Sequence, residues 1–327
     1  MFSAIKISPL QELDLSRWGL HGVRLFVKRD DLLFDHRAPY FCGNKWRKLK
    51  YNLLAAKEQG DDTLLTFGGA YSNHILATAD AGQLLGFQTI GIIRGEQHLP
   101  LNFTLRNARE RGMQLHYLDR TTYRNKNSAE VQARLLAKFG ACYLIPEGGT
   151  NALALRGCAE LGVEIQLQLT DVTFQDLRTL KKEADRPDYL ALSCGTGGTM
   201  AGLLSGLTTT KTKVIGFSAL KGDFLTGEIE QLLTQNELTT SAPWQIQTDY
   251  HFGGYAKFRP ELIDFIRRFK TVYDLQLDPI YTGKLFYGVF DLVKAGYFPK
   301  GSRIVVVHSG GLQGIAGFEE RYGEFLH

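Results

Sequence analysis

One lysine near the start of a predicted helix is well suited to covalent chemistry. Lys45 follows Gly43 and Asn44 and lies in a basic segment that continues to Lys50. An amine near the positive end of a helix and in an apolar pocket has a lowered pKa, which suits Schiff-base formation. Gly43 and Asn44 would let a bound cofactor lie close to the backbone. A solvated basic face is the alternative interpretation, and this segment alone leaves both open.

A glycine-rich turn between a predicted strand and a predicted helix could bind a phosphate group. Its glycines let the backbone approach an anion closely, and two threonine hydroxyls add donors to the amides at the helix start. The candidate ligands are Gly195, Thr196, Gly197, Gly198 and Thr199. A tight turn that holds no ligand is the alternative interpretation.

The same turn lacks the features of a nucleotide site. Met200 stands where the dinucleotide fingerprint requires a third glycine, and no acidic residue follows the next predicted strand at 213–218. A P-loop is excluded as well, because no Gly-Lys-Ser or Gly-Lys-Thr triplet occurs in the sequence. A single phosphate of a compact cofactor therefore fits this turn better than a nucleotide.

A second polar turn, from Gly68 to His74, also precedes a predicted helix. It contains Ser72 and Asn73, and its glycines and polar side chains predict another anion-binding turn. Ser72 could instead serve only as the N-cap of the helix. A hydrolase pair of Ser72 and His74 is a further possibility, but the Gly-x-Ser-x-Gly elbow of such enzymes is absent.

Three more loops carry aromatic or polar residues near the end of the chain. The segments are 250–255, which ends at Tyr255, 278–284, which contains Tyr281, and 308–313, which contains Ser309. Each loop alone would be interpreted as packing.

The elements that must position these residues alternate between strands and helices. Strands are predicted at 62–67, 88–93, 114–117, 142–145, 189–193, 213–218 and 303–308. Helices are predicted at 72–85, 102–111, 128–139, 224–235, 259–270 and 282–294, and one more begins at Thr199. Short strands separated by helices indicate βαβ units and an α/β fold with parallel sheets, whose ligands bind where strands end. We expect two sheets, each flanked by helices, with the apolar strand 303–308 central to its sheet.

Composition narrows the class of protein further. The 327 residues predict about two domains, and a hydrophobic content of 44% rules out a disordered chain. A net charge of +4 gives little support for nucleic-acid binding. No apolar run is long enough for a membrane span, and residues 1–10 lack the apolar stretch of a signal peptide. Four dispersed cysteines predict a reduced, cytoplasmic protein without a zinc site.

Taken in order, these segments resemble one family of enzymes. They look like the D-cysteine desulfhydrase and 1-aminocyclopropane-1-carboxylate (ACC) deaminase family, which depends on pyridoxal 5′-phosphate (PLP) and has the tryptophan-synthase-β-like fold. The resemblance runs from about residue 8 to about residue 320. It rests on the segments Gly43–Lys45, Gly68–His74, Gly195–Thr199, Asp278–Lys284 and His308–Gly311.

The resemblance implies a two-domain arrangement with PLP between the domains. Residues 1–47 and 154–327 would form a large PLP-binding domain, and residues 48–153 a smaller inserted one. We expect a small amino-acid substrate, no nucleic-acid or membrane partner, no metal, a homodimer and a cytoplasmic location.

The resemblance also implies roles for individual residues. Lys45 corresponds to the lysine that binds PLP covalently, next to Asn44, and Asn73 to the residue that bonds the ring hydroxyl. The turn from Gly195 to Thr199 would bind the phosphate. The residues placed around the substrate would be Ser72, Tyr255 and Tyr281. Ser309 falls where the desulfhydrase branch has a hydroxyl facing the pyridine nitrogen.

Two positions favour the desulfhydrase branch of the family. Thr282 follows Tyr281 where the ACC deaminases resembled here carry Glu, and Ser309 stands where they carry an apolar residue. We therefore expect α,β-elimination from a small D-amino acid, with D-cysteine giving pyruvate, sulfide and ammonia. The alternatives are ACC deaminase activity, which yields 2-oxobutyrate and ammonia, and a protein that binds PLP without turnover. The set Lys45, Ser72, Tyr255 and Tyr281 argues against mere binding.

Overall fold

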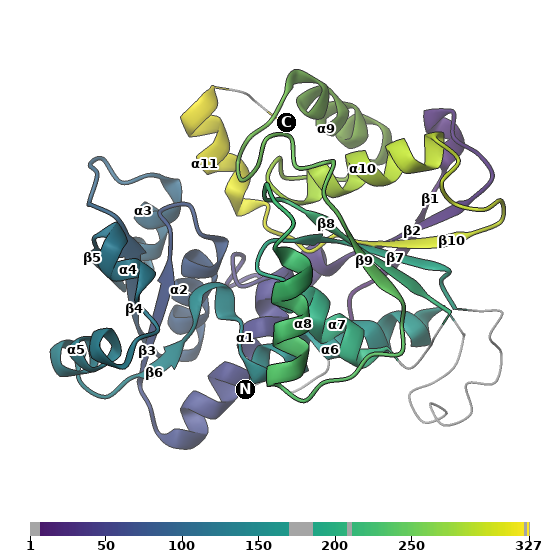
Figure 1. Ribbon diagram of the computed structural model, residues 1–327. Coiled ribbons are helices and arrows are strands. Elements are labelled where there is room, and N and C mark those ends of the chain that lie inside the picture. The colour runs from purple at the N-terminus through teal and green to yellow at the C-terminus, as the bar shows by residue number, and fades with distance from the viewer. Residues whose placement is uncertain (1–6, 170–185, 208–210, 324–325, 327) are drawn as a thin grey trace.

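Two separate β-sheets organise the computed structural model, which describes residues 7–169, 186–207, 211–323 and 326. The N-terminal segment inspected for a signal peptide therefore lies partly outside the described residues. Each sheet is flanked by helices, and both contain parallel strands, so the predicted α/β class is confirmed (Figure 1).

The smaller sheet has four parallel strands in the order β5-β4-β3-β6. Its strands are β3 (Thr63–Gly68), β4 (Gln88–Arg94), β5 (Met113–Leu118) and β6 (Tyr143–Ile145). Apolar residues of α1 (Gly43–Gln59), α2 (Asn73–Leu85) and α3 (Phe103–Glu110) pack in two clusters with residues of these strands. The alternate residues of β3 and β4, such as Leu65 and Phe67, pack instead with residues of α4 (Arg120–Arg124) and α5 (Ala129–Phe139). Helices therefore cover both faces of the sheet.

The larger sheet has six strands in the order β1-β2-β10-β7-β8-β9. They are β1 (Leu10–Leu13), β2 (Arg24–Lys28), β7 (Tyr189–Cys194), β8 (Lys213–Ser218), β9 (Trp244–Gln247) and β10 (Arg303–Val307). Only β1 runs antiparallel to its neighbour among these strands. The predicted central position of the apolar strand is confirmed, since β10 lies between β2 and β7 with four of its five residues buried.

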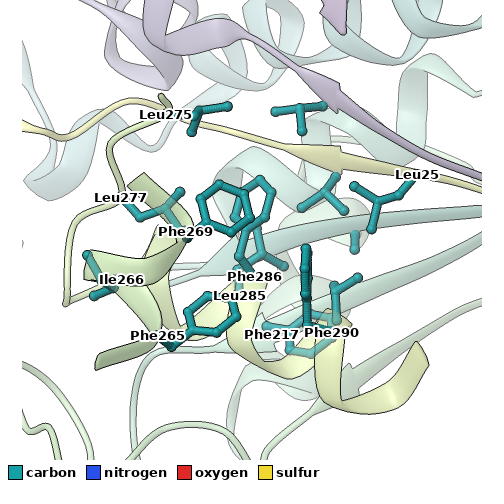
Figure 2. Packing of buried hydrophobic residues seen from close by; sticks show 14 of the residues in the cluster. Leu25, Phe217, Phe265, Ile266, Phe269, Leu275, Leu277, Leu285, Phe286 and Phe290 are labelled. Atoms are coloured by element: carbon teal, nitrogen blue, oxygen red, sulfur yellow. The ribbon is translucent and has the colours of Figure 1, made fainter. Parts of the chain in front are cut away.

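Alternate residues of this sheet enter two different cores. One core contains Leu25 and Phe217 with aromatic and aliphatic residues of α9 (Pro260–Tyr273) and α10 (Thr282–Lys294), including Phe269 and Phe286 (Figure 2). The opposite core contains residues of α6 (Ala152–Gln168), α7 (Gly198–Gly206) and α8 (Leu225–Gln235). Burial of this apolar surface fixes α7 and α10, whose first turns carry candidate site residues.

Two long helices connect the sheets. Helix α1 packs with β3 and β6 of the small sheet through Leu49 and Leu53, while its start contacts the loop after β10. Helix α6 follows β6 and packs in the core of the large sheet. The last helix, α11 (Gln313–Tyr322), follows β10 and lies beside α3 of the small sheet (Figure 1). No helix in the described part of the chain is long and apolar enough to cross a membrane.

Candidate active site

The first turn of α1 is locked against the loop that follows β10. Gly43 has a φ of +58°, and a Cβ added there would lie 2.1 Å from the carbonyl oxygen of Ser309. The next amide, of Asn44, donates to that same oxygen at 3.0 Å. A glycine is therefore required at 43 both by its conformation and by this close approach. The contact joins two segments about 265 residues apart and fixes where Lys45 emerges.

Lys45 has the lowered pKa expected of an amine that forms Schiff bases. Burial is the main cause, and the positive charge of Lys48 adds to it, so that the pKa falls to about 7. Near neutral pH a large fraction of the amine is then uncharged and nucleophilic. The direction agrees with the sequence-based expectation for this helix start.

Lys48 is a second buried lysine that sequence analysis missed. Its side chain is 2% exposed, and its ammonium donates to the carbonyl oxygen of Gly148 at 3.1 Å and to the hydroxyl of Thr150 at 2.9 Å. A Cβ added to Gly198 would lie 3.0 Å from this ammonium. A cation therefore stands beside the glycine-rich turn. The only signal in the sequence was its spacing, three residues after Lys45 on one helix face.

The glycine-rich turn connects β7 to α7 and carries both amide and hydroxyl donors. Gly197 adopts a φ of +74° at the N-cap of α7, where no side chain caps the helix. The hydroxyl of Thr199 accepts a hydrogen bond from the side-chain amide of Asn44 at 3.3 Å. The hydroxyl of Thr196 lies 3.2 Å from that of Thr150. An uncapped helix start, a glycine-rich turn and a nearby ammonium are together suited to binding an anion.

The first turn of α2 carries two side chains that each have one buried polar atom without a hydrogen-bond partner among the described residues. The Asn73 amide nitrogen donates to the carbonyl oxygen of Gly311 at 3.4 Å, but its buried oxygen lacks a hydrogen bond among the described residues. The His74 ring is 1% exposed, and its Nδ1 likewise has no partner there. Buried polar atoms are nearly always satisfied, so such atoms indicate a missing ligand or an incoming group.

Ser72 is the N-cap of α2, as the simpler interpretation predicted. Its hydroxyl accepts a hydrogen bond from the amide of Ile75 at 3.4 Å. His74 points its Nε2 to the hydroxyl of Thr66 at 2.7 Å. The two residues thus have different partners, and the structure gives no support for a Ser-His hydrolase pair.

Two tyrosines from different loops meet beside the glycine-rich turn. Their hydroxyls share a hydrogen bond, and the ring centroids of Tyr255 and Tyr281 are 6.1 Å apart. A Cβ added to Gly195 would lie 3.3 Å from the Tyr281 ring, which places this ring at the start of the turn. Burial raises the pKa of both hydroxyls, so both are neutral proton donors at physiological pH.

The loop that carries Tyr255 is held by a lysine of α10. Lys284 donates to the carbonyl oxygens of His251 at 2.8 Å and Gly254 at 2.7 Å. Gly254 has a φ of +117°, so the loop turns sharply just before Tyr255. The direction of Tyr255 thus depends on a buried lysine that sequence analysis did not single out.

The side chain of Thr282 forms a buried hydrogen bond with Asp278. Its buried hydroxyl donates to the Asp278 carboxylate at 2.6 Å. The same carboxylate accepts the amides of Ile280, Tyr281 and Thr282. Asp278 therefore fixes the first turn of α10 and the position of Tyr281.

The described contacts bring most of the predicted site residues into one region. Asn44 contacts both Thr199 and the Ser309 carbonyl, Asn73 contacts the glycines after Ser309, and Tyr281 packs on Gly195. Ser309 itself is buried. Among the described residues no group of three or more His, Cys, Asp or Glu side chains could hold a metal ion.

Comparison with known proteins agrees with this arrangement. The family described as "Pyridoxal-phosphate dependent enzyme" matches residues 1–310. The chain belongs to this family. The family resemblance inferred from the sequence motifs is confirmed, and the protein is a PLP-dependent enzyme.

Relatives of this PLP-dependent enzyme carry the names of both predicted activities. A protein of Pyrococcus abyssi named "Putative 1-aminocyclopropane-1-carboxylate deaminase" is 32% identical, over 93% of this chain and 89% of its own. An Arabidopsis thaliana protein named "Bifunctional D-cysteine desulfhydrase/1-aminocyclopropane-1-carboxylate deaminase, mitochondrial" is 31% identical, over 92% of this chain and 76% of its own. The solved structure of an "ACC deaminase homologue" superposes with a TM-score of 0.77 at 28% identity, covering 97% of this chain and 93% of that one.

The residues around Lys45 fit PLP as a ligand of this enzyme. PLP carries an aldehyde, a phosphate and a ring hydroxyl, and the site offers a partly neutral amine, an uncapped helix start with a neighbouring ammonium, and the unpartnered oxygen of Asn73. Three chemically distinct groups of the cofactor thus each find a complementary group.

Proposed function

We propose that this PLP-dependent enzyme eliminates the β-substituent of a small D-amino acid, and that D-cysteine gives pyruvate, sulfide and ammonia. The observation that carries the choice of branch is Thr282. This residue stands where the ACC deaminases resembled by the sequence carry Glu, and its hydroxyl is bonded to Asp278. The Asp278 carboxylate in turn accepts three amides. It is therefore not available as a substitute for that Glu.

In this proposal residues of α1, of α2 and of the turn that leads into α7 hold the cofactor. The amides from Gly195 to Thr199 bind the phosphate, with the Lys48 ammonium as the balancing charge. Asn73 bonds the ring hydroxyl. Lys45 provides the covalent link through its amine. PLP, when bound in this way, withdraws electrons from the Cα atom of an attached amino acid.

The remaining proton transfers fall to residues with suitable pKa values. The Lys45 amine, once displaced by the substrate, is partly neutral near pH 7 and can accept the Cα proton. The linked hydroxyls of Tyr255 and Tyr281 remain protonated because burial raises their pKa, so they can donate a proton to a departing thiolate. Ser72, at the start of α2, would contact the substrate.

Ser309 has a separate role in the proposal. A neutral hydroxyl facing the pyridine nitrogen leaves that nitrogen largely unprotonated, whereas a carboxylate would keep it charged. A less electron-withdrawing ring favours prompt loss of a β-leaving group over transamination. This property suits elimination from D-cysteine.

ACC deaminase activity is the second candidate, and the names of the relatives favour it. Product analysis separates the two activities. The purified holoenzyme is incubated with D-cysteine, L-cysteine, β-chloro-D-alanine and ACC, and pyruvate, 2-oxobutyrate and sulfide are quantified. Sulfide and pyruvate from D-cysteine with little 2-oxobutyrate from ACC support the proposal. Turnover of ACC at a rate equal to or above that of D-cysteine overturns it, and no turnover of any of the four favours a protein that only binds PLP.

We further propose the domain division and assembly expected from the sequence. Residues 48–153 would form the small inserted domain, residues 1–47 with 154–327 the large one, and two copies a homodimer. The strands of the four-stranded sheet all lie within residues 48–153. The strands of the six-stranded sheet all lie within residues 1–47 and 154–327. Light scattering after size-exclusion chromatography would measure the number of copies, and a mass near 36.6 kDa would contradict the homodimer.

A further inference from the structure

The residues that lead into α2 form a tight turn that ends at Ser72. The amide of Ser72 donates to the carbonyl oxygen of Gly69 at 3.0 Å, so Ala70 and Tyr71 are the two corner residues of this turn. The turn connects the end of β3 to the N-cap of α2. The positions of its two corner residues therefore decide where the Ser72 hydroxyl lies.

The first corner residue, Ala70, is held by Asn102. The side-chain nitrogen of Asn102 donates to the carbonyl oxygen of Ala70 at 2.9 Å. The side-chain oxygen of Asn102 accepts the amide of Leu105 at 2.9 Å and so caps α3. Because a peptide group is planar, a fixed Ala70 carbonyl also fixes the peptide that joins Ala70 to Tyr71. One side chain thus ties the turn to the start of a helix.

The second corner residue, Tyr71, packs against α11. A Cβ added to Gly317 would lie 3.1 Å from Cδ1 of the Tyr71 ring, which is closer than ordinary van der Waals contact. The guanidinium carbon of Arg321 lies 5.6 Å from the centroid of the same ring, within the range of a cation–π contact. The glycine at 317 therefore leaves the space that the Tyr71 ring occupies.

The two helices that hold the turn are also joined to each other. The Glu320 carboxylate on α11 accepts the backbone amide of Phe103 at 2.9 Å and lies 3.6 Å from the guanidinium of Arg106. Phe103 directly follows Asn102, so α11 holds the helix start from which Asn102 reaches the turn (Figure 1). Both corner residues of the turn are thus held from outside it.

The Ser72 hydroxyl at the end of this turn has a proton to offer. Its oxygen accepts the amide of Ile75 at 3.4 Å, and the hydroxyl donates to no group in the described part of the chain. A hydrogen bond weakens steeply when its distance or angle changes. A small displacement of the turn would therefore weaken a hydrogen bond from Ser72 to a bound molecule.

We propose that Asn102 is a positioning residue for the amino-acid substrate, because its hydrogen bond to Ala70 fixes the turn that places Ser72. The contact of Tyr71 with Gly317 supports the same turn from α11. This inference rests on the proposed function, in which Ser72 contacts the substrate. Asn102 itself touches neither the substrate nor PLP in this account.

Aspartate at position 102 removes the hydrogen bond to the turn and keeps the helix cap. In Asn102→Asp the carboxylate still accepts the amide of Leu105, and aspartate caps helices as well as asparagine does. It has no proton to donate to the Ala70 carbonyl. Asn107→Asp is the matched control, since Asn107 lies on the same helix and its side-chain nitrogen donates to the carbonyl oxygen of Phe103 within that helix.

The readout is binding of D-alanine to the full-length enzyme loaded with PLP. D-Alanine carries the amine and carboxylate of the proposed substrate but no β-leaving group, so its binding can be titrated from the visible band without elimination. Asn102→Asp should raise the Kd for D-alanine by roughly 3- to 10-fold, the loss expected from one neutral hydrogen bond. Asn107→Asp should leave this Kd unchanged. The Kd for PLP should stay close to that of the wild type in both variants.

A double variant tests whether Asn102 acts through Ser72. Ser72→Ala should itself raise the Kd for D-alanine, because it removes the hydroxyl that the turn positions. Adding Asn102→Asp to Ser72→Ala should then change the Kd little, since residues that act through one contact are not additive. A purely structural role of Asn102 would give additive effects instead.

Gly317→Ala tests the other support of the turn. The added Cβ would press on the Tyr71 ring, although alanine is the better helix former. The variant should therefore weaken D-alanine binding without lowering the midpoint of urea unfolding. Gly227→Ala in α8 is its control, because an added Cβ there meets nothing within 4 Å.

Equal Kd values for D-alanine in Asn102→Asp and Asn107→Asp would overturn the inference, as would additive effects in the double variant. If Asn102→Asp does not fold, equal Kd values in Gly317→Ala and Gly227→Ala overturn it. If D-alanine leaves the wild-type band unchanged, the same variants are compared by the KM of the substrate that is turned over. Failure of the proposed function looks different, since it appears in the wild type as a missing visible band or as the wrong products.

Discussion

The hydroxyl of Thr282 donates to the carboxylate of Asp278 at 2.6 Å, and both side chains are buried. This pair fixes the first turn of α10 and leaves no room for an acid at position 282 without bringing two carboxylates together. A carboxylate at 282 would therefore disturb the helix start that holds Tyr281.

Thr282→Glu should therefore destabilise the protein rather than create ACC deaminase activity. A buried, unpaired carboxylate beside Asp278 is expected to lower the free energy of unfolding by about 3–5 kcal/mol. Urea unfolding measures the change, with Thr282→Val as the control for loss of the hydroxyl alone. An unfolding midpoint equal to that of the wild type would show that the pocket accepts the acid.

Lys284→Met should release the loop that carries Tyr255. The variant leaves the carbonyl oxygens of His251 and Gly254 without their donor. Loss of this positioning is expected to lower kcat for D-cysteine by roughly 10- to 100-fold while PLP affinity stays the same. Lys294→Met, at the exposed end of the same helix, is the control. Full activity of Lys284→Met would mean that Tyr255 needs no support from α10.

Lys48→Met should weaken PLP binding because the ammonium beside the phosphate turn is removed. Loss of one charge-assisted hydrogen bond is expected to raise the Kd for PLP by roughly 10- to 100-fold. Lys50→Met is the matched control, since Lys50 pairs with Glu160 at 2.8 Å. Equal PLP affinities of the two variants would place the phosphate away from Lys48.

Gly197→Val tests the same turn less cleanly. Gly197 has a φ of +74°, and an added Cβ would lie 2.8 Å from Ile229. A valine there would strain the backbone and α8 as well as block the phosphate. Weaker PLP binding in that variant would therefore have two causes.

Tyr281→Phe should lower kcat more than it lowers PLP affinity. The change keeps the ring that packs on Gly195 and removes the hydroxyl that bonds Tyr255. Loss of a proton donor is expected to cost roughly 100-fold in kcat. Tyr287→Phe on the same helix controls for removal of a hydroxyl. If kcat for D-cysteine is retained in Tyr281→Phe, the proton for the leaving group comes from elsewhere.

The sequence predicted the elements whose pattern is local. Strands β3 and β4 are short apolar runs bounded by glycine or polar residues, and Ser72 caps its helix as one of the two interpretations expected. Strand β9 was missed because its alternating pattern extends over only four residues, half-buried at the edge of the sheet.

Helix α6 was missed for a different reason. Its sequence contains Gly157 and Gly162, which resemble helix breakers. In the structure Gly157 allows the backbone of α1 to approach, since an added Cβ would lie 2.0 Å from the carbonyl oxygen of Arg47. The helical conformation of α6 therefore depends on its close packing against α1, which no local sequence pattern reveals.

The same limit applies to the candidate site. Lys45 and the glycine-rich turn could be proposed from the sequence because each lies in a short motif. Lys48 and Lys284 could not be proposed in this way. The partner of Lys48, Gly148, lies 100 residues further along the chain. The partner of Lys284, Gly254, lies 30 residues earlier. Only the folded chain brings these groups together.

The visible spectrum of the purified protein tests the central claim most directly, namely that Lys45 carries PLP in this site. The wild-type protein and the control Lys50→Ala should be yellow, with a visible band from lysine-bound PLP. Lys45→Ala should keep its fold, as judged by circular dichroism, and lose that band even after PLP is added. A visible band retained in Lys45→Ala, or a folded wild-type protein that stays colourless with added PLP, would contradict the account.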